Sequence, residues 1–155
     1  MRRLYKGGVT FPGTAPTQAL PSLAMSEAEL QAMLEAVLEA NQAFYDAFEA
    51  RDIDAMSEVW EHTDRVVCTH PGWATLRGWG LIAGSWYTLF DNSEHLQFIV
   101  TNARPEIEGD IGWVVCDENI LGGGGGGTVA ALNLFARLPG GRWRMIGHHG
   151  SPVVA

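Results

Sequence analysis

The stretch SEAELQAMLEAVLEANQAFYDAFEARDID, residues 26–54, decides how the fold begins. Ser26 and Glu29 form a capping box, in which a hydroxyl and a carboxylate cover the free backbone N–H groups of a helix start. Apolar residues then recur at helical spacing as far as about Ala50. Asp52 is placed to cap a second, short helix with Ile53 on its apolar face. The stretch therefore predicts a long helix followed closely by a short one.

Outward from this stretch, the periodicity changes from that of helices to that of strands. Residues 64–70, DRVVCTH, predict a short strand, and a third helix is expected from about Gly78. Alternating patterns then predict strands at 94–108, 111–121, 128–138 and 142–151, with turns at 109–110 and 139–141. Helices followed by antiparallel strands indicate an α+β fold in which helices cover one face of a sheet.

The composition describes one acidic, folded domain. The chain has 155 residues, 46% of them hydrophobic, and a formal net charge of −8. This charge argues against nucleic acid or an anionic membrane as the main partner. No apolar run approaches the roughly 20 residues that a membrane helix needs, and no apolar stretch follows the first basic residues as in a secretory signal. With two cysteines, a reducing cytoplasmic location is expected.

Two segments stand apart from these elements. Residues 1–25, with three prolines, are interpreted as an N-terminal extension, and residues 26–155 as the domain. The Gly122–Gly127 run lacks the Lys and Ser/Thr that follow the last glycine of a phosphate-binding loop, so we expect a hairpin loop there. No dinucleotide fingerprint follows a predicted strand, and no organic cofactor is expected.

Several short motifs together carry a family resemblance. They are FYDAF at 44–48, RDID at 51–54, DRVV at 64–67, HPG at 70–72, LRG at 76–78 and WRMIGHHGSP at 143–152. With them the chain resembles the nuclear transport factor 2-like superfamily, and most closely its SnoaL-like and ketosteroid-isomerase-like members. The resemblance implies a cone in which a strongly curved, mainly antiparallel sheet wraps three N-terminal helices around a pocket. It also implies a homodimer formed through the convex face of the sheet.

The family pattern, combined with strand alternation, implies which strand residues face the pocket. It places Asp117, Asn119, Asn133 and His148 toward the pocket, with Val115 on the same face as Asp117, and it turns His149 outward. Adjacent residues of a strand point to opposite faces, so His148 and His149 cannot chelate one metal ion. A site built from His70, His148 and Asp117 has a permissible composition for a metal, but we expect no metal there.

The resemblance to ketosteroid isomerases suggests roles for individual residues. The catalytic base position falls on His70, and the position of the protonated aspartate falls on Asn133. The tyrosine position falls on Phe44, which removes one oxyanion donor. The aromatic positions fall on Trp60 and Trp86, and Trp73 is a candidate for the pocket mouth. Asp117 is a candidate to orient an imidazole, and structural roles for these residues are the alternative.

Three hypotheses for function follow, since such cones host isomerases, cyclases, hydrolases and binding or assembly domains. The first is a homodimer that binds a small apolar or aromatic molecule in its pocket. The second is an isomerase, cyclase or dehydratase with His70 as general base and Asn133 as hydrogen-bond donor. The third is an assembly module that works through its sheet face.

Overall fold

The chain folds as helices followed by strands, as predicted. The computed structural model describes residues 25–92, 96–122 and 126–154. The elements are α1 (Glu27–Ala50), α2 (Ile53–Val59), β1 (Val67–Thr69), β2 (Leu76–Arg77), α3 (Trp79–Asn92), β3 (Gln97–Glu108), β4 (Ile111–Leu121), β5 (Gly127–Arg137) and β6 (Trp143–Pro152). The α+β prediction is confirmed, and the two-residue strand β2 is an addition to it.

Side-chain caps define the starts of the first two helices. The Ser26 hydroxyl accepts the Glu29 N–H at 3.2 Å and the Glu29 carboxylate accepts the Ser26 N–H at 2.8 Å, so the predicted capping box is present. Arg51 then adopts a left-handed conformation that ends α1. The Asp52 carboxylate accepts backbone N–H groups of the next turn at 3.0 and 2.9 Å and starts α2.

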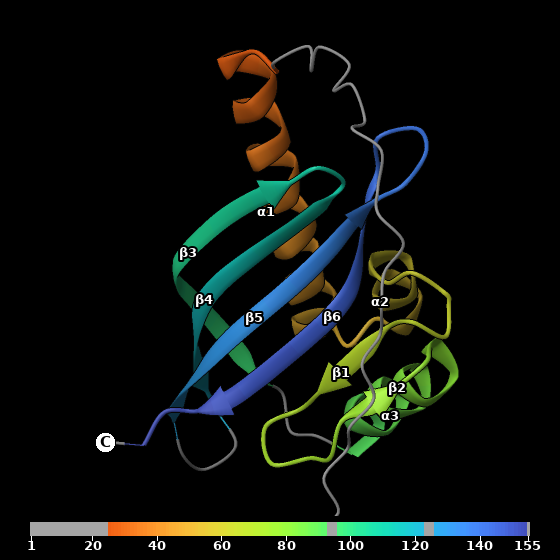
Figure 1. The fold of residues 1–155 in the computed structure, drawn as a ribbon. Helices are drawn as coiled ribbons and strands as arrows, with labels where there is room; N and C mark the ends of the chain where they lie inside the picture. The colour runs from red at the N-terminus through yellow and green to blue at the C-terminus, as the bar shows by residue number, and fades with distance from the viewer. Residues whose placement is uncertain (1–24, 93–95, 123–125, 155) are drawn as a thin grey trace, which may run out of the picture.

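The six strands form one curved, mainly antiparallel sheet in the order β2-β1-β6-β5-β4-β3 (Figure 1). β1 runs parallel to β6, and every other neighbouring pair is antiparallel. The pairing of β3 with β4 shifts register between Thr101 and Arg104, where Asn102 has a φ of 56°. Such a bulge bends a strand and increases its twist. The bend lets the sheet wrap partly around the helices.

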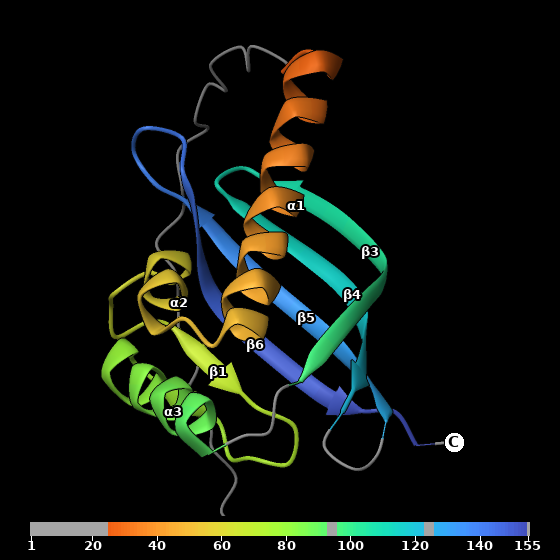
Figure 2. The same ribbon diagram turned by 180° about the vertical axis from the view of Figure 1, so that it is seen from behind.

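The helices cover the concave face of this sheet, with α1 crossing it and α3 beside β1 (Figure 2). Gly112 on β4 permits the close approach of α1, because a Cβ atom there would lie 2.8 Å from a methyl group of Val37. The buried core between helices and sheet includes Phe44, Trp60 and Met145. Trp60 and Trp86 are also buried in it.

Two predicted segments lie partly or wholly outside the described residues. The proposed N-terminal extension is one of them, apart from Met25. The glycine run is the other, although the pairing of Ile120 with Gly127 places it between the antiparallel strands β4 and β5. Within the described part of the chain, no helix is both long and apolar enough to cross a bilayer. Cys68 and Cys116 are free and buried.

Candidate functional site

A cavity of about 180 Å³ opens between the sheet and the helices at the end of the cone near α3. It is lined by Phe44, Tyr45, Phe48, His70, Pro71, Trp73, Leu89, Leu96, Phe98, Glu118, Ile120 and His148. Most of these side chains are aromatic or aliphatic, and the polar ones come from α1, β4, β6 and the loop after β1. Small-molecule sites have this character: apolar walls with a few convergent polar groups.

A buried tyrosine and carboxyl form the first part of the polar wall. The Tyr45 hydroxyl donates to Glu118 at 2.8 Å, and the two residues are only 2% and 4% exposed. Burial raises the pKa of Glu118 to about 7, although the Tyr45 hydrogen bond acts in the opposite direction. The pKa of Tyr45 is raised as well, first by burial and then by the Glu118 charge. Glu118 can therefore gain or lose a proton near neutral pH.

Asn133 lies outside the cavity lining and connects Tyr45 to His148 through hydrogen bonds. Its side-chain amide donates to the Asn41 oxygen at 2.8 Å and to the Tyr45 hydroxyl at 3.1 Å. Its oxygen accepts from Nδ1 of His148 at 2.7 Å. Asn133 is fully buried but is absent from the cavity lining, and its amide hydrogens already have acceptors. Asn133 is therefore a residue that positions Tyr45 and His148.

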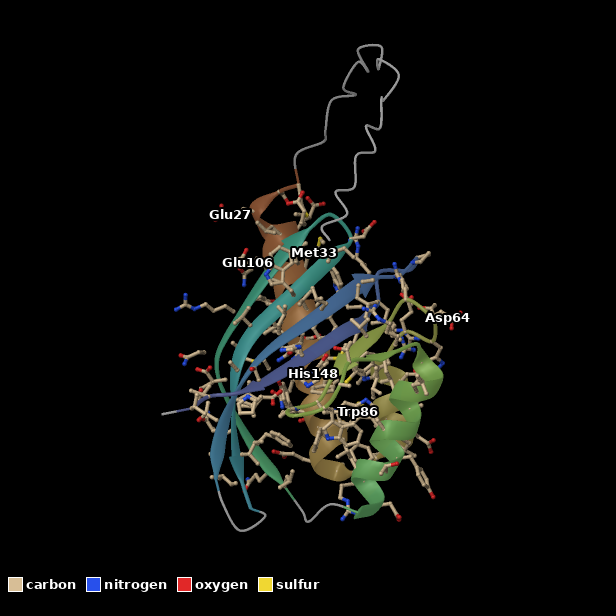
Figure 3. The ribbon with its side chains drawn as sticks, turned by 60° about the horizontal axis from the view of Figure 1, so that its bottom comes forward. Glu27, Met33, Asp64, Trp86, Glu106 and His148 are labelled. Atoms are coloured by element: carbon tan, nitrogen blue, oxygen red, sulfur yellow. The ribbon has the colours of Figure 1, made fainter. Side chains whose placement is uncertain are left out.

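His148 lies on β6 beside Trp86 of α3, and both side chains point into the space between sheet and helix (Figure 3). Because Nδ1 of the neutral ring carries the donated proton, Nε2 is left as an acceptor. Burial lowers the pKa of His148 to about 3, with smaller contributions from the charges of His70 and His149. The ring is therefore neutral at physiological pH.

His70 is held by α3 and by two tryptophans. The Ser85 hydroxyl donates to the Ile82 carbonyl at 2.7 Å, so it accepts from Nε2 of His70 at 2.9 Å. The His70 ring packs nearly perpendicular to the rings of Trp73 and Trp86, with ring centroids 5.0 and 4.6 Å away. Burial lowers the pKa of His70 to about 4. The imidazole lines the cavity, but it is a weaker base than the sequence-based expectation assumed.

The prediction that Asp117, Asn119 and Val115 face the pocket is wrong. In β4 the buried positions are those of Val114, Cys116 and Glu118, and Val115 is 51% exposed on the other face. Asp117 accepts from Asn102, and the Asn119 side chain bonds to Ile99, Thr101 and Thr128. Close packing of α1 on Gly112 selects the face that turns inward. Asp117 is therefore not placed to orient a cavity imidazole.

The tryptophans divide between the core and the cavity mouth. Trp73 lines the cavity and is 43% exposed, which places it at the opening. Trp86 packs against His70 and Trp60 packs near Trp79, with ring centroids 4.6 and 6.4 Å apart. Neither Trp86 nor Trp60 is among the lining residues. The expectation that Trp60 and Trp86 form pocket walls is therefore wrong, since both are part of the packing behind that wall. Phe44, by contrast, does line the cavity.

Sequence reasoning missed Tyr45 and Glu118. The tyrosine position of the family pattern falls on Phe44, yet neighbouring positions 44 and 45 on α1 both line the cavity. A hydroxyl is thus present where the sequence indicated that one was lost. A signal for Glu118 existed in the alternate face of residues 111–121, which carries one carboxyl among apolar residues. Among the described residues, no cluster of three His, Cys, Asp or Glu side chains could hold a metal ion.

Comparisons with known families and solved structures show which proteins this chain resembles. The profile of the SnoaL-like domain family matches residues 37–155. F-box protein SKIP8 of Arabidopsis thaliana is 28% identical over 126 residues, which are 81% of this chain. The chain spans only 53% of the length of that plant protein.

Solved structures with the same architecture include two with substantial sequence identity. A protein of Streptomyces avermitilis, assigned to the NTF2-like family and provisionally named a dehydratase, is 36% identical with a TM-score of 0.75. The match covers 81% of this chain and 99% of that one. A protein of Thiobacillus denitrificans, provisionally named a calcium/calmodulin-dependent protein kinase type II association domain, is 33% identical with a TM-score of 0.69. This match covers 74% and 93% of the two chains. The cone-shaped fold expected from the sequence is thus confirmed.

Proposed function

Because this chain belongs to the SnoaL-like domain family of the NTF2-like superfamily, we propose that it binds a small, mainly apolar or aromatic molecule inside the cone. The observation that carries the proposal is the cavity of about 180 Å³ with aromatic walls and polar groups along one side. An engineered apolar cavity of about 150 Å³ is known to bind benzene. The space therefore suits a ligand with one ring, and a molecule with several rings would require the walls to move.

Fluorine NMR of fluorobenzene tests this proposal directly. The wild-type protein should give a bound resonance that a cavity-filling variant, Ile120→Trp, lacks. Ile120 lines the cavity, whereas Val115 lies on the opposite face of the same strand, so Val115→Trp is the matched control and should retain the signal. Equal signals from all three proteins, or none from the wild type, would contradict cavity binding. Native mass spectrometry of freshly purified protein would also reveal a ligand carried from the cell.

An acid–base enzyme is the second candidate, favoured by the presence of Glu118 and His70 beside one cavity. We propose an isomerase, cyclase or dehydratase in this case. Its ionised base would be Glu118 rather than His70, because a catalytic pKa near 7 suits proton transfer at neutral pH. The similarity to the Streptomyces avermitilis protein provisionally named a dehydratase supports a reaction that removes water.

A one-ring hydroxyketone, 3-hydroxycyclohexanone, is a suitable probe of dehydration. The base would take a proton from the carbon beside the carbonyl, the C–O bond would break, and the proton would leave with the hydroxyl as water. Formation of the enone is followed by ultraviolet absorbance. Loss of the rate in Glu118→Gln with retention in His70→Ala assigns the base to Glu118. The reverse pattern assigns it to His70, as the family pattern suggests, and an unaccelerated wild-type reaction contradicts dehydration of this probe.

Self-association is supported by the outer face of the sheet. Ile99, Val115 and Leu132 are large apolar residues exposed on it, at 49%, 51% and 38%. The related Thiobacillus denitrificans protein is named for an association domain. We propose that the chain forms a homodimer through this face. We also propose a cytoplasmic location, since both cysteines are buried free thiols. Light scattering should give twice the chain mass for the wild type and a monomer for Val115→Asp combined with Leu132→Asp. A monomeric wild type would contradict both the dimer and the assembly function.

A further inference from the structure

The hydrogen-bond directions around the cavity restrict what a ligand can offer. Among the described residues, four polar side chains with hydrogen-bonding groups inside the cone line it: Tyr45, His70, Glu118 and His148. Tyr45 has one proton to donate, and it donates to Glu118 at 2.8 Å. The same hydroxyl accepts from Asn133 at 3.1 Å and lies 3.3 Å from the Cys116 sulfur. The hydrogen-bonding positions of the Tyr45 hydroxyl are therefore taken by protein groups.

Both imidazoles also have their N–H groups committed to the protein. The two amide hydrogens of Asn133 go to Asn41 and Tyr45, so its oxygen can only accept, and His148 must donate from Nδ1. The Ser85 hydroxyl donates to a backbone carbonyl, so His70 must donate to Ser85 from Nε2. A neutral imidazole has one N–H. Nε2 of His148 and Nδ1 of His70 are consequently acceptors, and the Cys68 sulfur lies 3.9 Å from the latter.

Glu118 adds a third acceptor on this wall. One oxygen of Glu118 accepts the hydrogen bond of the Tyr45 hydroxyl. When the group is ionised, the other oxygen can only accept. Among the described residues that line the cavity, there is no lysine or arginine. Among the described lining side chains, the remaining N–H group belongs to Trp73, which is 43% exposed at the mouth, where water competes for it.

We propose that the cavity selects one-ring ligands bearing a hydroxyl or N–H donor, such as phenols and aromatic amines, over ligands of equal size whose polar group only accepts. The inference rests on the proposed function, because it names the ligand class of the same cavity. A carbonyl or carboxylate placed against His70, Glu118 and His148 would lose its hydration and face the lone pairs of these three groups. Burying a polar group without a partner is unfavourable, whereas a donor would satisfy the site.

Calorimetric titration at pH 8 with four probes tests this selectivity. The probes are phenol, anisole, benzaldehyde and toluene, which share one ring and differ in what the substituent donates or accepts. Phenol should bind about tenfold more tightly than benzaldehyde, as one well-formed hydrogen bond allows. Equal affinities, or tighter binding of benzaldehyde, would overturn the inference.

A single substitution should abolish the preference. Glu118→Gln preserves the shape of the side chain and its acceptor for Tyr45 but introduces an amide N–H₂ in place of the second carboxylate oxygen. The ratio of phenol to benzaldehyde affinity should then fall about tenfold. Glu106→Gln removes the same charge from an exposed position on β3 and should leave the ratio unchanged. A ratio that stays at its wild-type value in Glu118→Gln would contradict the inference.

The toluene arm separates failure of this inference from failure of the proposed function. Toluene has no polar group, so its binding depends on the cavity alone. Toluene binding without a preference for phenol would overturn the selectivity and leave small-molecule binding intact. If none of the four probes binds, both the selectivity and the proposed binding of one-ring ligands fail.

Discussion

Tyr45 on α1 donates a 2.8 Å hydrogen bond to Glu118 on β4, although the two residues are 73 positions apart in sequence. Asn133 on β5 donates to the same hydroxyl, and His148 on β6 donates to Asn133. One buried network thus joins the first helix to three strands along the cavity. Its members fix each other's hydrogen-bond directions, so changes to it should affect both stability and the protonation of Glu118.

Removal of the Tyr45 hydroxyl should weaken the fold. In Tyr45→Phe, the Glu118 carboxyl loses its donor and one Asn133 N–H loses its acceptor, both in a buried place. We expect a loss of about 1–3 kcal/mol in the free energy of unfolding, measured with urea. Tyr87→Phe is the control, because Tyr87 is 66% exposed on α3 and should change stability by less than about 0.5 kcal/mol. Equal effects would show that the Tyr45 bond contributes nothing to stability.

Glu118 should give the stability a distinct pH dependence. Burial raises its pKa from 4.5 to about 7, so the folded protein holds this proton at pH values where the unfolded chain has released it. Its contribution to stability is therefore complete below about pH 4.5 and is lost as the pH rises through about 7. Glu118→Gln does not titrate at this position. The stability of the wild type relative to this variant should fall by about 3 kcal/mol over that range.

Denaturant unfolding of both proteins at pH 4.5, 6 and 8 measures this difference. His70 and His148 have lowered pKa values and stabilise the fold increasingly as the pH rises, but they are present in both proteins. Their contribution therefore cancels in the comparison. A difference between wild type and variant that does not change with pH would show that Glu118 is solvated like an ordinary carboxyl.

Two asparagines on neighbouring strands test which face turns inward. Asn133 is fully buried with three hydrogen bonds, so Asn133→Ala should lower the free energy of unfolding by about 2–4 kcal/mol. Asn119 also makes several hydrogen bonds, but on the outer face and partly in solvent. Asn119→Ala should lower it by less than about 1 kcal/mol. Similar losses in the two variants would contradict the face assigned to β4.

Two glycine substitutions probe how closely α1 packs on the sheet. A Cβ atom at Gly112 would lie 2.8 Å from Val37 and 3.3 Å from Trp143, so Gly112→Ala should destabilise the protein by about 1–3 kcal/mol. Gly80 lies in α3 with open space around it. Gly80→Ala should stabilise by about 0.5–1 kcal/mol, because alanine is the better helix former. Thermal unfolding of both variants checks the opposite signs, and a stable Gly112→Ala would contradict the close approach.

Local patterns were sufficient to predict the order and type of the elements. Some signals depend only on residues close together in sequence, so they can be recognised there directly. They are the Ser26–Glu29 capping box, the Asp52 cap and the alternation of residues 111–121. Strand boundaries agree with the predictions to within three residues at their starts and one at their ends. The short strand β2 was not predicted, because a segment of two residues is too short to show a periodic pattern.

The candidate site was only partly predictable, because it depends on contacts between distant elements. His70, His148 and Phe44 lie at the cavity as the family pattern implied, and so does Trp73, the candidate for the pocket mouth. Asp117, Asn119 and Val115 do not, because both faces of β4 mix apolar residues with a carboxyl and only the packing of α1 decides between them. The shifted pKa of Glu118 has the same origin: it arises from burial by side chains that are far away in sequence.

The most direct test of ligand binding in the cone is a crystal soaked with 4-bromophenol, whose bromine is located by anomalous scattering. We predict one strong bromine peak inside the cavity near Phe98 and Ile120, with the phenol oxygen within hydrogen-bond distance of Glu118, His70 or His148. A cavity closed by the lining side chains, or bromine found only at the surface, would contradict the account.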